Sequence, residues 1–198
     1  MRKMYLSAPL PFVGQKRMLA KEFMKVLEQY PDGTLFVDLF GGSGLLSHIT
    51  KSLKPHSTVI YNDFDNYRFR MKHIPQTNQL LADIREMVGN SVPRHKIIKG
   101  ELRERIFSRI EQEENSTGYV DFITLSSSIL FSMKYKLSVQ DMRKEALYNN
   151  IRKTGYPECT DYLEGLEIVS CDYKEVFNRY KDIPGVVFLV DPPYLSTD

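Results

Sequence analysis

The stretch Gly185-Val-Val-Phe-Leu-Val-Asp191-Pro-Pro-Tyr194 decides the fold expected for this chain. Its apolar run, residues 186–190, has the length of one buried strand, and the two prolines end that strand because proline lacks a backbone donor. Asp191 therefore lies at the carboxyl edge of a sheet, where open α/β sheets bind ligands. A carboxylate, the backbone carbonyl of Pro192 and the ring of Tyr194 suit a planar substrate that carries an amine. The alternative is a strand that stops at an ordinary turn.

Length and composition indicate one α/β domain with room for a small subdomain. The chain has 198 residues, of which 42% are hydrophobic and 26% charged, as in ordinary water-soluble proteins. No apolar run has the length of a membrane span, and the N-terminus has no long apolar signal region. The two cysteines, Cys159 and Cys171, form no CxxC pair. We therefore expect a cytoplasmic protein with no membrane segment and no metal site.

A glycine loop follows the first predicted strand. The strand covers residues 34–40, the loop is Gly41-Gly-Ser-Gly44, and a helix begins near Leu45. The loop lacks the Gly-x-Gly-x-x-Gly pattern and no Lys-Ser/Thr follows it, so neither the dinucleotide nor the phosphate-loop fingerprint fits. Asp38, at the strand end, would repel a phosphate but could accept a hydrogen bond from an ammonium or hydroxyl group. This combination points to S-adenosylmethionine, which carries no phosphate.

Acidic residues also follow two later predicted strands. The strand at 58–62 ends in Asp63-Phe-Asp65, about where a ribose diol is held in nucleotide-binding folds. Asp63 is the first choice for that role and Asp65 the second. Asp172 follows the strand at 166–169 and could accept from an adenine amino group. Helix N-capping is the alternative for each of these carboxylates.

Helical patterns border and interrupt the α/β pattern. A helix is expected over residues 15–30, with Lys16 in its first turn, where its charge opposes the helix dipole unless an anion or ligand lies nearby. Residues 66–165 carry 16 Lys and Arg against 13 Asp and Glu, with helices expected at 65–88, 93–114, 119–136 and 138–153. We expect 1–65 and 166–198 to form an α/β domain and 66–165 to be a helical insertion.

These motifs, in this order, resemble the Dam-type (alpha-class) adenine-N6 DNA methyltransferases. The resemblance implies a Rossmann-like, S-adenosylmethionine-dependent methyltransferase sheet with a target-recognition insertion at 66–165. It implies double-stranded DNA as substrate and allows a partner restriction endonuclease. The implied catalytic residues are Asp191, Pro192 and Tyr194. The implied cofactor-binding residues are Phe12, Lys16, Asp38, Gly41, Gly44, Asp63, Asp172 and Asp191.

The chain departs from the family pattern in two places. Members often have Trp where Phe12 stands and a second Gly where Gln15 stands. They also continue beyond the Asp-Pro-Pro-Tyr motif with further strands, whereas this chain stops at Asp198, so we expect it to be C-terminally incomplete. Two alternatives stay open: a methyltransferase that acts on RNA or a protein amide, and a non-catalytic nucleic-acid-binding or cofactor-binding remnant.

Overall fold

The computed structural model describes residues 3–14, 16–131 and 135–192, and the chain divides into two compact units. Unit 1 comprises Met1–Met71 and Cys159–Asp198, and unit 2 is the continuous segment Lys72–Glu158. Unit 1 therefore extends several residues beyond the boundaries expected at 65 and 166. At the first boundary the cause is Tyr67, which is fully buried in unit 1 and whose hydroxyl group bonds both the N–H (2.9 Å) and the carbonyl (3.2 Å) of Leu10. At the second boundary it is Tyr162, which is fully buried and stacks on His48.

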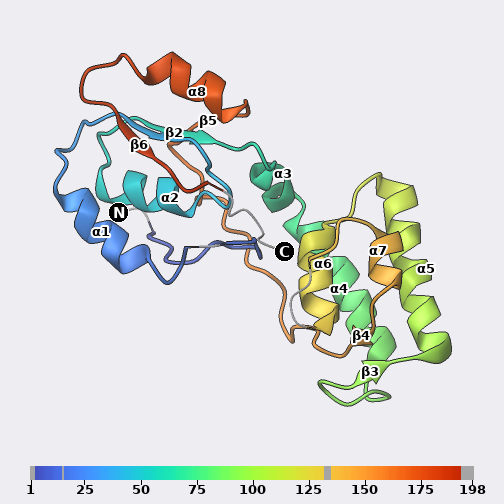
Figure 1. Ribbon diagram of the computed structural model, residues 1–198. Helices are drawn as coiled ribbons and strands as arrows, with labels where there is room; N and C mark the ends of the chain where they lie inside the picture. Colours follow the sequence, from blue (N-terminus) through green and yellow to red (C-terminus); the bar gives the residue numbers. More distant parts are fainter. Residues whose placement is uncertain (1–2, 15, 132–134, 193–198) are drawn as a thin grey trace, which may run out of the picture. The chain divides into compact units, whose positions relative to one another are not determined.

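Unit 1 is built on a parallel sheet of four strands, which confirms the expected Rossmann-like α/β class (Figure 1). The strand order is β5-β2-β1-β6, and the three pairings are parallel. The strands are β1 (Phe36–Asp38), β2 (Val59–Asn62), β5 (Glu167–Val169) and β6 (Val187–Leu189). The chain progresses from β1 outward through β2 to β5 and then returns to the other side of β1. This reversal creates a topological switch point at the carboxyl end of β1.

Helices cover both faces of this sheet (Figure 1). The helices of unit 1 are α1 (Ala20–Glu28), α2 (Leu45–Leu53), α3 (Tyr67–Lys72) and α8 (Tyr173–Tyr180). Phe36 packs with Leu27 of α1 and Ile49 of α2 on one face, whereas Val37 packs with Val176 of α8 on the other. Because successive strand residues point to opposite faces, β1 is buried along its whole length between two helical layers.

Unit 2 is helical, with one short antiparallel strand pair. Its helices are α4 (Ile74–Val88), α5 (Gly100–Thr117), α6 (Phe122–Ile129) and α7 (Val139–Arg143), and its strands are β3 (Ile97–Ile98) and β4 (Leu147–Tyr148). Fully buried side chains such as Leu81, Ile84, Phe107 and Ile110 give unit 2 its own apolar core.

The four helices expected over residues 65–153 all differ from the observed helices in their extent. α5 begins at Gly100 rather than at 93, and α6 ends at Ile129 rather than at 136. The pattern at 65–88 forms two helices, α3 and α4, separated at His73, because Pro75 lies in the first turn of α4 and has no N–H to donate to an earlier turn. The segment 138–153 forms only the short helix α7 before the chain extends into β4. Within the described residues, no helix has the length and apolar character needed to cross a membrane.

Candidate active site

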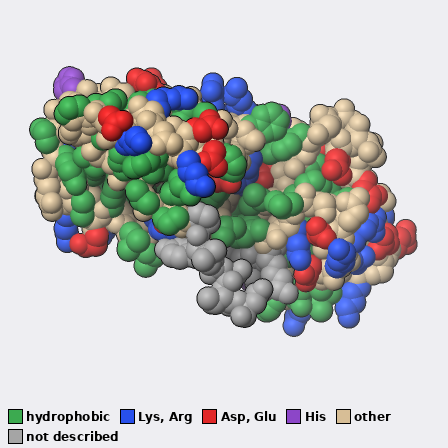
Figure 2. Space-filling view, turned by 45° about the horizontal axis from the view of Figure 1, so that its top comes forward, with side chains coloured by type: hydrophobic (Ala, Val, Ile, Leu, Met, Phe, Trp, Pro, Cys, Tyr) green, Lys and Arg blue, Asp and Glu red, His purple; other side chains and the backbone are tan. Residues whose placement is uncertain are grey.

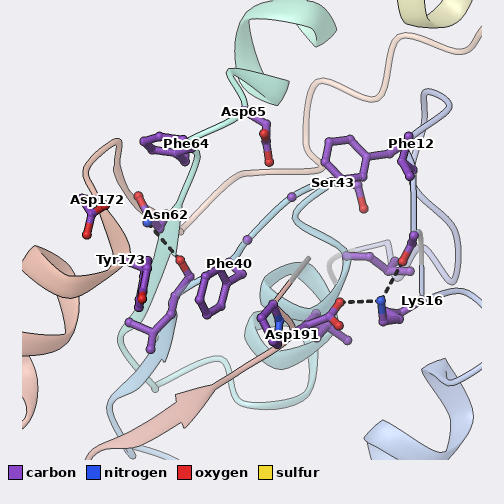
Figure 3. Close-up of a pocket in the computed structure, with 18 residues that line it drawn as sticks. Phe12, Lys16, Phe40, Ser43, Asn62, Phe64, Asp65, Asp172, Tyr173 and Asp191 are labelled. Carbon is purple, nitrogen blue, oxygen red and sulfur yellow. Dashed lines mark hydrogen bonds and ion pairs between the residues drawn. The ribbon is translucent and has the colours of Figure 1, made fainter. Parts of the chain in front are cut away.

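A pocket of about 570 Å³ lies at the carboxyl edge of the sheet in unit 1 (Figure 3). This volume is in the range of small-molecule and cofactor sites. Segments that follow all four strands contribute to it, as does the loop before α1. The lining residues are Phe12, Val13, Gly14, Lys16, Leu39, Phe40, Gly41, Gly42, Ser43, Leu45, Leu46, Asn62, Phe64, Asp65, Asp172, Tyr173, Asp191 and Pro192. The pocket therefore lies at the switch point of the sheet, and Asp191 lies at the carboxyl edge where the sequence predicted it.

The glycine loop between β1 and α2 forms the floor of this pocket. Gly44 has φ +71°, a left-handed conformation that favours glycine, and it begins α2 without a side-chain cap. Gly41 has no room for a side chain, because a Cβ atom there would lie 2.3 Å from the Tyr61 ring and 2.8 Å from the carbonyl oxygen of Asn62. Because the loop backbone packs closely against β2, the pocket on the other side of the loop keeps space for a ligand.

Two buried tyrosines hold the carbonyl groups of this loop, and sequence reasoning missed both. The hydroxyl group of Tyr61 donates to the carbonyl of Gly42 (2.8 Å), and that of Tyr162 donates to the carbonyl of Ser43 (3.1 Å). The ring of Tyr162 stacks on His48 of α2, 4.7 Å between centroids. No sequence motif marks these tyrosines, because their role depends on contacts between segments far apart in the chain.

The two acidic residues after β2 have different surroundings. Asp63 is buried and absent from the pocket lining; its carboxylate accepts from the backbone N–H groups of Tyr67 (2.6 Å) and Arg68 (3.0 Å). It therefore caps the start of α3, which was the alternative interpretation of this residue. Asp65 lines the pocket. Burial raises the pKa of both carboxyl groups.

Aromatic rings line the part of the pocket near α8. The rings of Phe40 and Tyr173 lie 4.8 Å apart, and Phe64, 65% exposed, extends from the β2 end (Figure 3). Asp172 lies beside them and also caps α8, accepting from the backbone N–H of Lys174 at 2.8 Å. Both sequence interpretations of Asp172, a pocket residue and an N-cap, therefore hold geometrically. Stacking surfaces with a nearby acceptor suit a purine ring with an exocyclic amine.

Asn62 joins three strand ends beneath these rings and was also missed. Its amide group donates to the carbonyls of Leu39 (3.0 Å) and Cys171 (2.9 Å), and its oxygen accepts from the N–H of Cys171 (3.1 Å). These bonds tie the segments after β1 and β5 to the end of β2. Asn62 thus fixes the spacing of the pocket walls.

Asp38 ends β1 beneath the pocket and is not part of its lining. The side chain is 1% exposed, its Oδ2 accepts from the Ser47 hydroxyl at 2.7 Å, and its Oδ1 has no hydrogen-bond partner among the described residues. Burial, opposed by the Ser47 hydrogen bond and reinforced by the charge of Asp191, raises the pKa of Asp38 to about 7. The sequence predicted a direct contact between Asp38 and a ligand. The Asp38 side chain instead lies below the pocket floor.

Lys16 and Asp191 form an ion pair at the pocket wall near α1. Lys16 Nζ lies 2.7 Å from Asp191 Oδ2 and 2.9 Å from the carbonyl oxygen of Gly14. The expected place of Lys16 in the first helical turn was wrong, because α1 begins at Ala20. An anion does lie beside Lys16, and it is the carboxylate of Asp191. Pro192 also lines the pocket, while the predicted aromatic residue Tyr194 lies outside the described residues.

The charges that line the pocket determine which ligand it suits. Among the described lining residues, three carry carboxylates, Asp65, Asp172 and Asp191, and one carries an ammonium group, Lys16. Such a lining disfavours a polyphosphate and favours a nucleoside that carries positive charge. The glycine floor, the stacking rings and the carboxylates fit that description together. The described residues contain no cluster of His, Cys, Asp and Glu suited to a metal ion.

An open parallel sheet with a glycine loop after β1 and an Asp-Pro strand end at the pocket defines the Rossmann-like methyltransferase class. A sequence model of the D12 class N6 adenine-specific DNA methyltransferase family matches residues 12–198, and the chain belongs to this family. A Haemophilus influenzae protein named "Putative methyltransferase" is 40% identical over 200 residues, covering 99% of this chain and 67% of that protein. The resemblance noted from the motifs is thereby confirmed.

Proposed function

We propose that the protein is a site-specific DNA methyltransferase that transfers a methyl group from S-adenosylmethionine to N6 of adenine. The observation that carries the proposal is the position of Asp191 and Pro192. They follow a buried strand directly and reach a pocket whose other carboxylates suit a cationic nucleoside. Membership of the D12 family supports adenine as the acceptor base.

The pocket offers a place for each part of the cofactor. The purine ring would stack among Phe40, Phe64 and Tyr173, with Asp172 accepting from its amino group. The ribose diol would bind Asp65, because the oxygens of Asp63 already cap α3. The amino-acid end would lie over the glycine loop, where the free N–H groups at the start of α2 can bind a carboxylate.

Positioning and hydrogen bonding would accomplish the transfer. When bound, the cofactor would supply an electrophilic methyl group on a sulfonium, with a neutral thioether as the leaving group. The Asp191 carboxylate and the Pro192 carbonyl would accept the two hydrogens of the adenine amino group. This arrangement directs the nitrogen lone pair, otherwise delocalised into the ring, toward the methyl carbon. Asp191 would also accept the proton that the nitrogen loses when it takes up the methyl group. An aromatic partner, Tyr194 by resemblance, would stack on the flipped adenine.

Unit 2 carries a basic edge that supports a nucleic-acid acceptor over a protein amide. Around the β3–β4 pair, residues 92–100 and 146–157 contain no acidic residue. Their exposed basic side chains form no ion pair with any described residue; they are Arg94, Lys96, Lys99, Arg152 and Lys153. By contrast, Arg109 and Arg143 of unit 2 pair with acidic residues. Unpaired cations suit a phosphate backbone, so we assign target recognition to unit 2.

The basic edge is a local feature of the surface. On the face drawn in Figure 2, Lys and Arg side chains elsewhere lie among Asp and Glu side chains, in keeping with a net charge of only +2. The proposal includes a partner restriction endonuclease only because the family resemblance allows one.

The test is transfer of a labelled methyl group from S-adenosylmethionine to three acceptors: duplex DNA, RNA of the same sequence and a protein extract. We expect label in DNA as N6-methyladenine. Asp191→Ala should reduce transfer by at least about a thousandfold while S-adenosylhomocysteine still binds, because the carboxylate acts on the acceptor. Label in RNA or protein alone would support the second enzyme hypothesis. Full turnover by Asp191→Ala would overturn the assignment of Asp191, and cofactor binding without transfer to any acceptor would indicate a remnant.

A further inference from the structure

We propose that Lys16 is a positioning residue for Asp191: its ammonium group holds one carboxylate oxygen so that the other faces the target amine. The inference rests on the proposed function and changes the role that the family resemblance implied for Lys16, which was to bind the cofactor. It concerns the part of the pocket where the acceptor base, and not the cofactor, is expected to bind.

The contacts of Lys16 are directed at the chain itself. Its Nζ atom is 2.7 Å from Asp191 Oδ2 and 2.9 Å from the Gly14 carbonyl oxygen, and Figure 3 shows both contacts. The side chains of Lys16 and Asp191 are 17% and 25% exposed, so the pair is partly shielded from water. A charge-assisted bond of this length restrains the rotation of the carboxylate.

The backbone on both sides of the pair is fixed. Gly14 has φ +74°, a left-handed conformation that favours glycine. In this conformation its carbonyl group points toward the ammonium group of Lys16. The carbonyl of Lys16 accepts from the N–H of Leu19 at 2.9 Å, which closes the turn before α1. Asp191 follows β6, whose Leu189 carbonyl accepts from the N–H of Leu39 at 3.1 Å. The pair thus joins two anchored segments.

The charge balance of the pocket distinguishes this role from cofactor binding. If the ammonium of Lys16 bound the cofactor carboxylate, its removal would weaken cofactor binding. If it acts only on Asp191, its removal leaves Asp65, Asp172 and Asp191 facing the cofactor with no Lys or Arg among the described lining residues. A net-cationic ligand would then bind as well as before or better.

The first experiment measures S-adenosylmethionine binding and methyl transfer for Lys16→Met, Lys16→Arg and the control Lys21→Met, an exposed lysine of α1 outside the pocket. For Lys16→Met we expect kcat to fall on the order of 100-fold, as for a misplaced catalytic group, with KM for DNA and the cofactor Kd within about threefold of wild type. Lys16→Arg should restore most of the loss, and Lys21→Met should behave as wild type.

Two results would overturn the inference while the proposed function stands. One is wild-type kcat in Lys16→Met. The other is a cofactor Kd that rises in step with the loss of activity, which would make Lys16 a cofactor ligand. Absence of transfer by the wild-type chain would instead count against the proposed function and against the positioning role of Lys16 with it.

A second measurement tests the pair in the chain without cofactor or DNA. Urea unfolding of Lys16→Met, Asp191→Asn and the double variant forms a double-mutant cycle. We expect the double variant to lose less stability than the sum of the two single losses, because each single change already breaks the pair. Additive losses would show that Lys16 does not hold Asp191 and would overturn the inference, whatever the activity.

Discussion

Asp38 carries a buried carboxyl group beneath the pocket, and its protonation should be visible in the stability of the whole chain. Burial raises the pKa of Asp38 from its ordinary value of 3.8 to about 7. Between these two pH values the folded state binds a proton that the unfolded state has released. Stability therefore falls as the pH rises through this window and stays low above it.

Replacing Asp38 with Asn keeps the shape of the neutral carboxyl group and removes the titration. We expect Asp38→Asn to match wild type near pH 4 and to be more stable at pH 8 by up to about 4 kcal/mol. Urea unfolding of both proteins at several pH values measures the difference. Parallel stability curves for the two proteins would show that Asp38 is ionised in the folded state throughout this range.

At the same scale, the sequence located the acidic strand ends but could not assign each its role. Asp63 and Asp65 are two positions apart, and either spacing from the glycine loop fits a ribose ligand. The two residues have different roles because α3 begins at Tyr67, so that the carboxylate of Asp63 accepts from the first N–H groups of that helix. Asn62, Tyr61 and Tyr162 could not be found for a similar reason: their hydrogen bonds join residues 19 to 119 positions apart.

At the scale of elements, the glycine loop depends on its close packing against β2. A Cβ atom at Gly41 would lie 2.3 Å from the Tyr61 ring and 2.8 Å from the Asn62 backbone oxygen, which cannot rotate away. We expect Gly41→Ala to displace the loop, destabilise the chain by about 1–3 kcal/mol and abolish S-adenosylhomocysteine binding. Unfolding and calorimetric titration measure the two effects.

A matched control separates the clash from the general cost of replacing glycine. Gly185 has φ +77° and open space around its Cβ position, so Gly185→Ala should cost only the left-handed strain of about 1–2 kcal/mol and leave binding intact. Retained binding in Gly41→Ala would contradict the account of the loop.

The strands of unit 1 were predictable because each lies in a short, mainly apolar run that a polar residue ends or soon follows: Asp38 ends β1, Asn62 ends β2, and Asp191 lies two residues after β6. The strand pair of unit 2 was not predicted, because β3 and β4 are two residues long and show no periodicity. Their pairing depends on the match of Ile97 with Tyr148 and of Ile98 with Leu147, across about fifty residues of helical sequence.

At the scale of the whole molecule, the chain leaves the sheet after β2, forms unit 2 and returns at Cys159 to complete the same sheet. Both passages contribute to one pocket: Asp65 precedes the excursion, and Asp172 and Asp191 follow it. The segment that returns also supplies Tyr162, which supports the glycine loop formed before the excursion. The pocket can therefore form only when the two passages of unit 1 are assembled.

We expect this assembled pocket to bind the methyl-donating nucleoside through Asp65. Calorimetric titration of the chain with S-adenosylhomocysteine, with Asp65→Ala beside it, tests this expectation most directly. We expect the wild-type chain to bind in the micromolar range and the folded variant to bind at least about tenfold more weakly. Binding that is unchanged by Asp65→Ala, or absent from a wild-type chain shown to be folded, would contradict the expectation.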